Sequence, residues 1–126
     1  FKKQDVRRVV MCTGKLYYEL HAARAERQLG DTAILRVEQL YPISEAALRD
    51  ALAAFPDSAT VAWVQEEPHN MGAWRFIQAH LRDTVFAGRT LHGVTRHESA
   101  SPATGSAAAH RIEQDELIEE ALTIGD

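Results

Sequence analysis

VRRVVMCTGK, residues 6–15, is the stretch of sequence that decides the fold class. Its first seven residues are largely β-branched or apolar and lack the alternation of a strand with one face in water. Such a strand is buried on both faces, which is typical of a parallel sheet covered by helices. Thr13 and Gly14 interrupt the apolar run, and Thr13 is predicted to cap the following helix. We therefore expect a strand at 6–12 and a helix at 15–29, closed by Gly30.

The same alternation of strand and helix continues to the end of the chain. Parallel strands need crossover connections, and helices supply them. A small, polar segment at 98–106 is predicted to be a long loop. The chain is therefore expected to form one domain over 1–126, an α/β three-layer sandwich with a mostly parallel sheet of four to five strands. The further expected elements are strands at 33–40, 60–65 and 90–95, and helices at 44–55 behind the cap Ser44, at 73–83 and at 107–122.

Composition excludes several classes of protein. The net charge of -4 argues against a nucleic-acid-binding protein, which needs a basic face. No apolar run approaches the roughly 20 residues of a membrane span, and no secretory signal pattern is present. The single cysteine, Cys12, forms no internal disulfide, which fits a reducing compartment. Because the chain opens at Phe1 and not at a methionine, we interpret it as a fragment of a longer polypeptide.

Candidate binding residues gather where the predicted strands end, since ligands of parallel sheets bind beyond the carboxyl ends of the strands. Thr13 at a helix start, together with Arg36 and Arg96, could bind an anion. The alternative is that Thr13 only caps its helix and that the arginines pair with carboxylates. We favour this alternative, because neither a P-loop nor a GxGxxG motif is present.

Other conspicuous residues are better explained without catalysis. Glu66 and Glu67 follow a strand, but consecutive strand residues point to opposite faces and cannot share one substrate. They are interpreted as possible interface residues. Trp74 lies at a loop-to-helix turn and fits an interface or the core equally well. No metal-ligand spacing or nucleophile elbow is present, so no catalytic, cofactor-binding or metal residue is assigned.

Four segments carry a resemblance to a known family. They resemble segments of the decarboxylating components of 2-oxoglutarate dehydrogenase complexes, in the same order and over nearly the whole chain. The chain departs from the family pattern at His97 and in the residues 69–71. The four segments are VMCTGKLYY at 10–18, RVEQLYP at 36–42, QEEPHNMGAW at 65–74, and Arg96 with SASPATG at 99–105.

The resemblance implies a parent oxidoreductase of the tricarboxylic acid cycle. The parent binds thiamine diphosphate and magnesium, decarboxylates 2-oxoglutarate and passes a succinyl group to a lipoyl arm. It is a homodimer of the transketolase type whose partners are its own preceding domains, the second subunit and the dihydrolipoyl succinyltransferase component. This chain resembles its C-terminal assembly domain, with the cofactor bound outside it. The resemblance also implies that the isolated domain is inactive, and a location in the bacterial cytoplasm or the mitochondrial matrix.

Two further points follow from the resemblance. Some relatives bind the activator acetyl-CoA in this domain, and Thr13, Arg36 and Arg96 match positions expected near it. The family fold also has an antiparallel edge strand before the first strand seen here. The alternatives are a stand-alone nucleotide- or CoA-binding regulatory module and the equivalent domain of a 2-oxoadipate dehydrogenase.

Overall fold

Strands and helices alternate along the chain, as the sequence predicts. The structure, a computed structural model, describes residues 2–40, 42–97 and 107–126. The loop expected at 98–106 therefore lies outside the described residues. The elements are η1 (Lys3–Asp5), β1 (Arg8–Cys12), α1 (Leu16–Arg27), β2 (Thr32–Arg36), α2 (Glu45–Ala53), β3 (Thr60–Pro68), α3 (Trp74–Phe76), η2 (Ile77–Leu81), β4 (Leu91–Arg96) and α4 (Ala107–Thr123).

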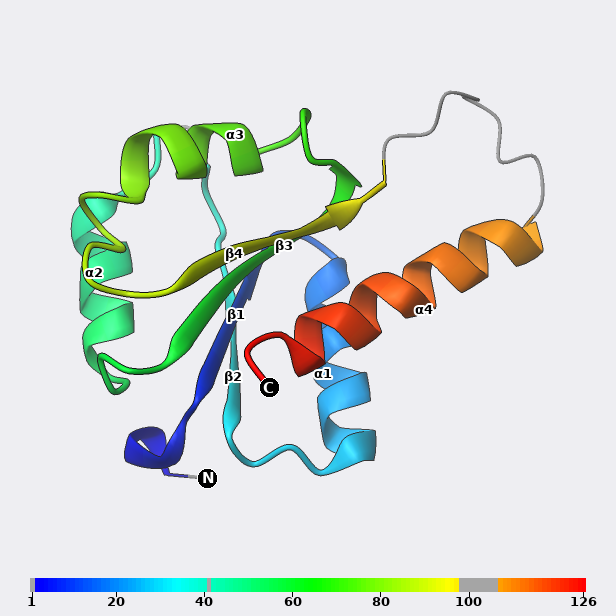
Figure 1. The fold of residues 1–126 in the computed structure, drawn as a ribbon, viewed down its shortest axis with the longest axis horizontal. Coiled ribbons are helices and arrows are strands. Elements are labelled where there is room, and N and C mark those ends of the chain that lie inside the picture. The colour runs from blue at the N-terminus through cyan, green and yellow to red at the C-terminus, as the bar shows by residue number, and fades with distance from the viewer. Residues whose placement is uncertain (1, 41, 98–106) are drawn as a thin grey trace.

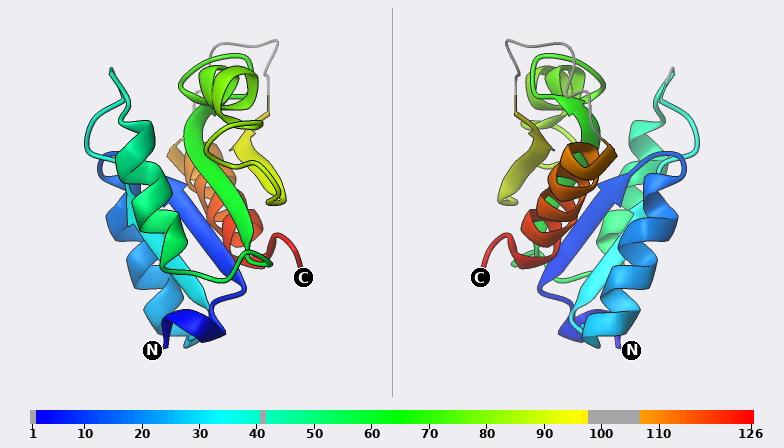
Figure 2. Two further views of the ribbon diagram at one scale, coloured as in Figure 1. Left: turned by 90° about the vertical axis from the view of Figure 1, so that its left-hand side faces the viewer. Right: turned by 90° about the vertical axis from the view of Figure 1, so that its right-hand side faces the viewer.

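The strands form one parallel sheet (Figure 1). Within the described residues its order is β2-β1-β3-β4, and each neighbouring pair is parallel. Val10 of the inner strand β1 lies opposite Ile34 of β2 and Ala62 of β3. The start of β1 and the last residues of the chain lie at the same end of the molecule (Figure 2). The predicted parallel sheet is confirmed, with four strands.

Two apolar layers cover the sheet, one on each face. Residues of β1 alternate between them: Val9 and Met11 contribute to one layer, Val10 and Cys12 to the other. The first layer includes side chains of α2, α3 and η2, and the second includes side chains of α1 and α4. The three-layer sandwich expected from the doubly buried strands is therefore confirmed.

Two predicted helix ends are wrong. Helix α1 begins after Lys15, with no side-chain hydrogen bond at its cap, so Thr13 does not cap it. The physical reason is that Gly14, at a φ of 64°, takes up a turn between the strand and the helix. At the other end, Gln28 and not Gly30 closes the helix, because Gln28 adopts the left-handed conformation and its N–H bonds to Ala25 and Arg24.

Other local predictions differ by a few residues or are confirmed. Strand β2 ends at Arg36, because its partner β1 ends at Cys12; the Val37 N–H still donates to the Cys12 carbonyl at 2.8 Å. Ser44 does cap α2, and its side chain accepts a hydrogen bond from the Ala47 N–H at 3.1 Å. The helix predicted at 73–83 is a short α-helix that continues as the π-helix η2.

Candidate functional site

The predicted site residues are spread along the carboxyl edge of the sheet. Arg36 ends β2, Arg96 ends β4, and Glu66 and Glu67 lie near the end of β3. Because β2 and β4 are the two outer strands, three strand spacings, about 14 Å, separate the backbones of the two arginines. The two guanidinium groups therefore lie at different parts of the carboxyl edge.

Arg36 is engaged by neighbouring side chains. Its guanidinium donates to the Tyr18 hydroxyl at 3.2 Å and lies 5.4 Å from the centre of the Tyr18 ring. Its Nε atom also lies 3.6 Å from a carboxylate oxygen of Glu38. Thr13 is half-buried in the turn between β1 and α1. The contact with Glu38 agrees with the alternative interpretation, in which Arg36 pairs with a carboxylate.

Arg96 belongs to a network that includes Glu66. Its guanidinium donates to Glu113 at 3.0 Å and to the side-chain oxygen of Gln114. Gln114 is 3% exposed, and its amide donates to Glu66 at 2.8 Å and to Glu19 at 2.5 Å. Gln114 thus joins α1, β3 and β4 to α4. Sequence reasoning missed it, although a polar residue three and four positions before Leu117 and Ile118 on a buried helix stripe was a usable signal.

A cavity of about 530 Å³ lies beside this network, between the starts of α1 and α4. Lys15 at the start of α1 and His110 in α4 both line this cavity. The part of the chain that the structure describes holds no group of three His, Cys, Asp or Glu that could bind a metal ion. Among these residues no helix is long and apolar enough to cross a membrane. The cavity is lined by Lys15, Tyr18, Glu19, Glu66, His110, Arg111 and Gln114.

Strand β3 bulges where Glu66 and Glu67 lie. Its pairing with β4 shifts register between Val64 and Pro68. Glu66 contacts Gln114 of α4, whereas Glu67 is exposed beside Gly72 on the other side of the strand. The two carboxylates therefore diverge, as consecutive strand residues do.

Trp74 lies in the core, one of the two positions that the sequence left open. Only 8% of it is exposed, and its indole covers Gly93 so closely that a Cβ atom there would lie 2.2 Å from the ring. The backbone N–H of Trp74 donates to the side-chain oxygen of Gln65 at 2.9 Å. The Trp74 side chain therefore packs inside this chain.

Comparison with known proteins now decides the family. A family model described as 2-oxoglutarate dehydrogenase C-terminal matches residues 1–122. The chain belongs to this family. It is 43% identical over 117 residues to the 2-oxoglutarate dehydrogenase E1 component of Cupriavidus necator, a match that covers 93% of this chain and 12% of that protein.

Other relatives have similar names, and a similar share of their length is matched. The E1 component of Azotobacter vinelandii is 40% identical over 124 residues, covering 96% of this chain and 13% of the relative. The E1/E2 component of Corynebacterium glutamicum is 40% identical over 117 residues, covering 93% of this chain and 10% of the relative. The chain thus spans about an eighth of the length of the E1 components it matches, and the resemblance seen in the sequence is confirmed.

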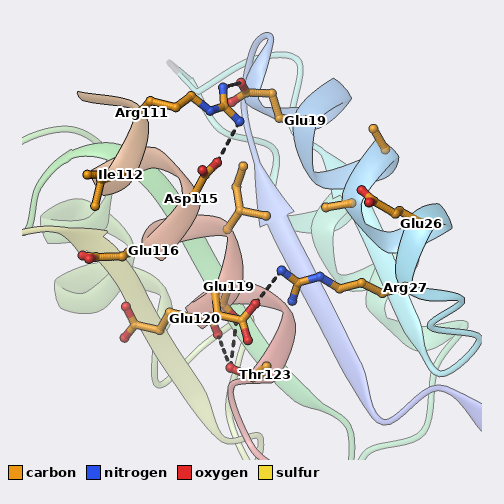
Figure 3. A pocket seen from close by; sticks show the side chains of 13 residues that line it. Glu19, Glu26, Arg27, Arg111, Ile112, Asp115, Glu116, Glu119, Glu120 and Thr123 are labelled. Carbon is orange, nitrogen blue, oxygen red and sulfur yellow. Dashed lines mark hydrogen bonds and ion pairs between the residues drawn. The ribbon is translucent and has the colours of Figure 1, made fainter. Parts of the chain in front are cut away.

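This member of the 2-oxoglutarate dehydrogenase family also has a groove between α1 and α4 (Figure 3). The groove measures about 970 Å³, and ion pairs join the two helices across it. Arg27 of α1 lies 2.5 Å from Glu119 of α4, and Arg111 of α4 lies 3.6 Å from Glu19 of α1. These partly exposed pairs connect the two helices along the groove.

Cys12 ends β1 beneath this carboxyl edge. The thiol is buried, and this burial raises its pKa to about 12, although Arg36 acts in the opposite direction. A thiol that stays protonated is a poor nucleophile and a poor metal ligand.

Proposed function

We propose that this chain is the C-terminal assembly domain of an E1 component and that it supplies contacts and shape, not reacting groups. The observation that carries the proposal is the family match over residues 1–122, together with relatives that are named E1 components and are about eight times longer. The site geometry supports it, because Arg36, Arg96 and Glu66 are bound to other side chains of the same chain.

The proposed parent decarboxylates 2-oxoglutarate with thiamine diphosphate and magnesium and passes the succinyl group to a lipoyl arm. The proposal places this cofactor in the preceding domains, so no step of that chemistry is assigned to this chain. The proposed partners are the preceding domains, a second E1 subunit and the dihydrolipoyl succinyltransferase component. The proposed location is the bacterial cytoplasm, or the mitochondrial matrix in a eukaryote.

Turnover of 2-oxoglutarate tests this proposal. We expect the full-length polypeptide to decarboxylate 2-oxoglutarate and the chain 1–126 alone to show no turnover. A full-length protein that prefers 2-oxoadipate would favour the alternative substrate. Turnover by the isolated chain would refute the proposal that this chain supplies no reacting groups.

A regulatory anion site at the carboxyl edge is a second candidate function. Thr13, Arg36 and Arg96 are the residues proposed for it, with acetyl-CoA as the activator. The cavity of about 530 Å³ lies at the same edge and is lined by Lys15 and His110, but by none of these three residues. Calorimetry of the full-length enzyme with acetyl-CoA and with AMP tests it, and the absence of heat with both would remove it.

A further inference from the structure

Two large apolar side chains are exposed at the carboxyl edge, and hydrogen bonds reach the backbone of one, Met71, and the hydroxyl of the other, Tyr18. Met71 is 57% exposed after β3, and Tyr18 is 60% exposed in the first turn of α1. The two preceding strands, β3 and β1, are neighbours in the sheet. A single exposed apolar residue is ordinary on a protein surface, so the way these two are held carries the argument.

The turn at 67–72 is fixed from inside by the amide of Gln65. The side-chain nitrogen of Gln65 donates to the carbonyl oxygens of Pro68 at 2.9 Å and Met71 at 2.7 Å. Its side-chain oxygen accepts from the Trp63 indole at 3.0 Å and from the Trp74 N–H at 2.9 Å. This buried amide therefore uses both of its ends to hold an exposed turn.

Gly72 completes the turn. Its φ is 67°, and a Cβ atom there would lie 2.8 Å from a carboxylate oxygen of Glu67 and 3.0 Å from the Gln65 side-chain oxygen. A side chain at this position would disturb both the backbone and the hydrogen bonds of Gln65. Met71 is consequently presented in one backbone conformation.

Tyr18 is fixed in a comparable way. Its hydroxyl accepts a hydrogen bond from Arg36, and its ring lies edge-on to that of Tyr17 at 5.5 Å between centres. Exposed aromatic and methionine side chains are enriched in protein interfaces. Groups that are already ordered before binding lose less conformational entropy when a partner arrives.

We propose that Met71 and Tyr18 are the anchors by which this chain docks on the remainder of the same E1 polypeptide. This inference rests on the proposed function. Most of the length of the related E1 components lies outside the region matched here, and a tethered partner is present at a high effective concentration. Glu67 is exposed and forms no ion pair with the described residues, so the docked surface supplies an apolar socket for Met71 and a basic or N–H group for Glu67.

Methionine oxidation in the full-length enzyme tests the docking surface. The chain has two methionines: Met11 is buried and sets the slow reference rate, and a synthetic peptide of residues 65–74 sets the fast one. With hydrogen peroxide we expect Met71 of the intact enzyme to form sulfoxide at least about tenfold more slowly than the peptide. Oxidation of Met71 at the rate of the peptide would overturn the proposal.

A pair of variants of the full-length enzyme gives a second measurement. Met71→Glu places a charge in the proposed socket, whereas Ile112→Glu changes a side chain of similar exposure, 58%, which lines the groove between α1 and α4. We expect faster hydrogen exchange at 15–19 and 67–72 in Met71→Glu and unchanged exchange there in Ile112→Glu. Equal exchange in both variants would refute the inference.

Activity separates this inference from the proposed function. An enzyme that turns over 2-oxoglutarate while Met71 oxidises freely would refute the docking surface alone. An enzyme with a protected Met71 and no turnover of 2-oxoglutarate would support the docking surface and refute the proposed function.

Discussion

Among the glycines of the described residues, Gly93 leaves the least room for a side chain. The indole of Trp74 lies where a side chain of residue 93 would begin, at 2.2 Å from an added Cβ atom. We expect Gly93→Ala to lower the free energy of unfolding by about 1–3 kcal/mol, because the buried ring must leave its position. Urea unfolding followed by tryptophan fluorescence measures this loss.

Gly30 provides the matched control for that substitution. No atom lies within 4 Å of a Cβ atom added there, and its φ is not in the left-handed region. Gly30→Ala should therefore change the free energy of unfolding by less than about 1 kcal/mol. If both substitutions lower the free energy of unfolding equally, the contact with Trp74 does not restrict which residue can stand at position 93.

Cys12 gives a prediction about pH. Burial raises the pKa of its thiol from 9.0 to about 12, so deprotonation favours the unfolded chain. Stability should fall as the pH rises from 9 towards 12, and Cys12→Ala should remove this part of the pH dependence. At pH 8 a thiol reagent should leave the folded protein unmodified and label it fully in denaturant. Rapid labelling of the folded protein would contradict the buried position.

At the scale of the elements, Arg8 of β1 and Arg7, the residue before this strand, bind the last residues of the chain. Arg8 is buried, and its guanidinium donates to the carboxylate of Asp126, to the Ile124 carbonyl at 2.8 Å and to the Thr32 hydroxyl at 2.9 Å. Arg7 donates to the same carboxylate at 2.9 Å. These bonds attach the residues after α4 to the amino edge of the sheet (Figure 2).

Removal of this carboxylate should loosen α4. Asp126→Ala leaves the buried Arg8 guanidinium with one partner fewer, and we expect a loss of about 1–3 kcal/mol in the free energy of unfolding. Asp57→Ala is the control, because Asp57 is fully exposed and lies 3.4 Å from Arg89, which also bonds to two carbonyl oxygens. Thermal unfolding of both variants checks the difference, and equal losses would show that Asp126 does not anchor the helix.

Elements were predictable where a local pattern decides them, and contacts between elements were not. The apolar run ending at Cys12 identified a doubly covered strand, because burial on both faces removes the alternation of polar residues. Thr13 and Gly30 failed as helix ends, because the chain enters and leaves α1 through Gly14 and Gln28 in left-handed conformations. Arg36 and Arg96 could be placed at the carboxyl edge from the sequence, because each lies at or near the end of a predicted strand. The side chains that bind these arginines were not predictable, because Tyr18 and Glu113 lie on helices whose packing is set by the whole fold.

At the scale of the whole molecule, the sheet separates two cores that share its strands. Both tryptophans, Trp63 and Trp74, belong to the core beneath α2, α3 and η2. Leu117 of α4 belongs to the core on the opposite face. Since β1 and β3 contribute alternate residues to both cores, loss of one core should remove the support of the other.

Leu117→Ala tests this coupling across the sheet. The buried leucine leaves a cavity under α4, so we expect a loss of about 2–4 kcal/mol in the free energy of unfolding. Although neither tryptophan lies on that face, their fluorescence should report the same shifted urea midpoint as the helical circular dichroism signal. Leu48→Ala, on the tryptophan face, is the matched control and should also give coincident transitions. A fluorescence midpoint that stays at the wild-type value while the circular dichroism midpoint falls would mean that the two faces unfold separately. The strands would then carry no cooperativity from α4 to the tryptophan core.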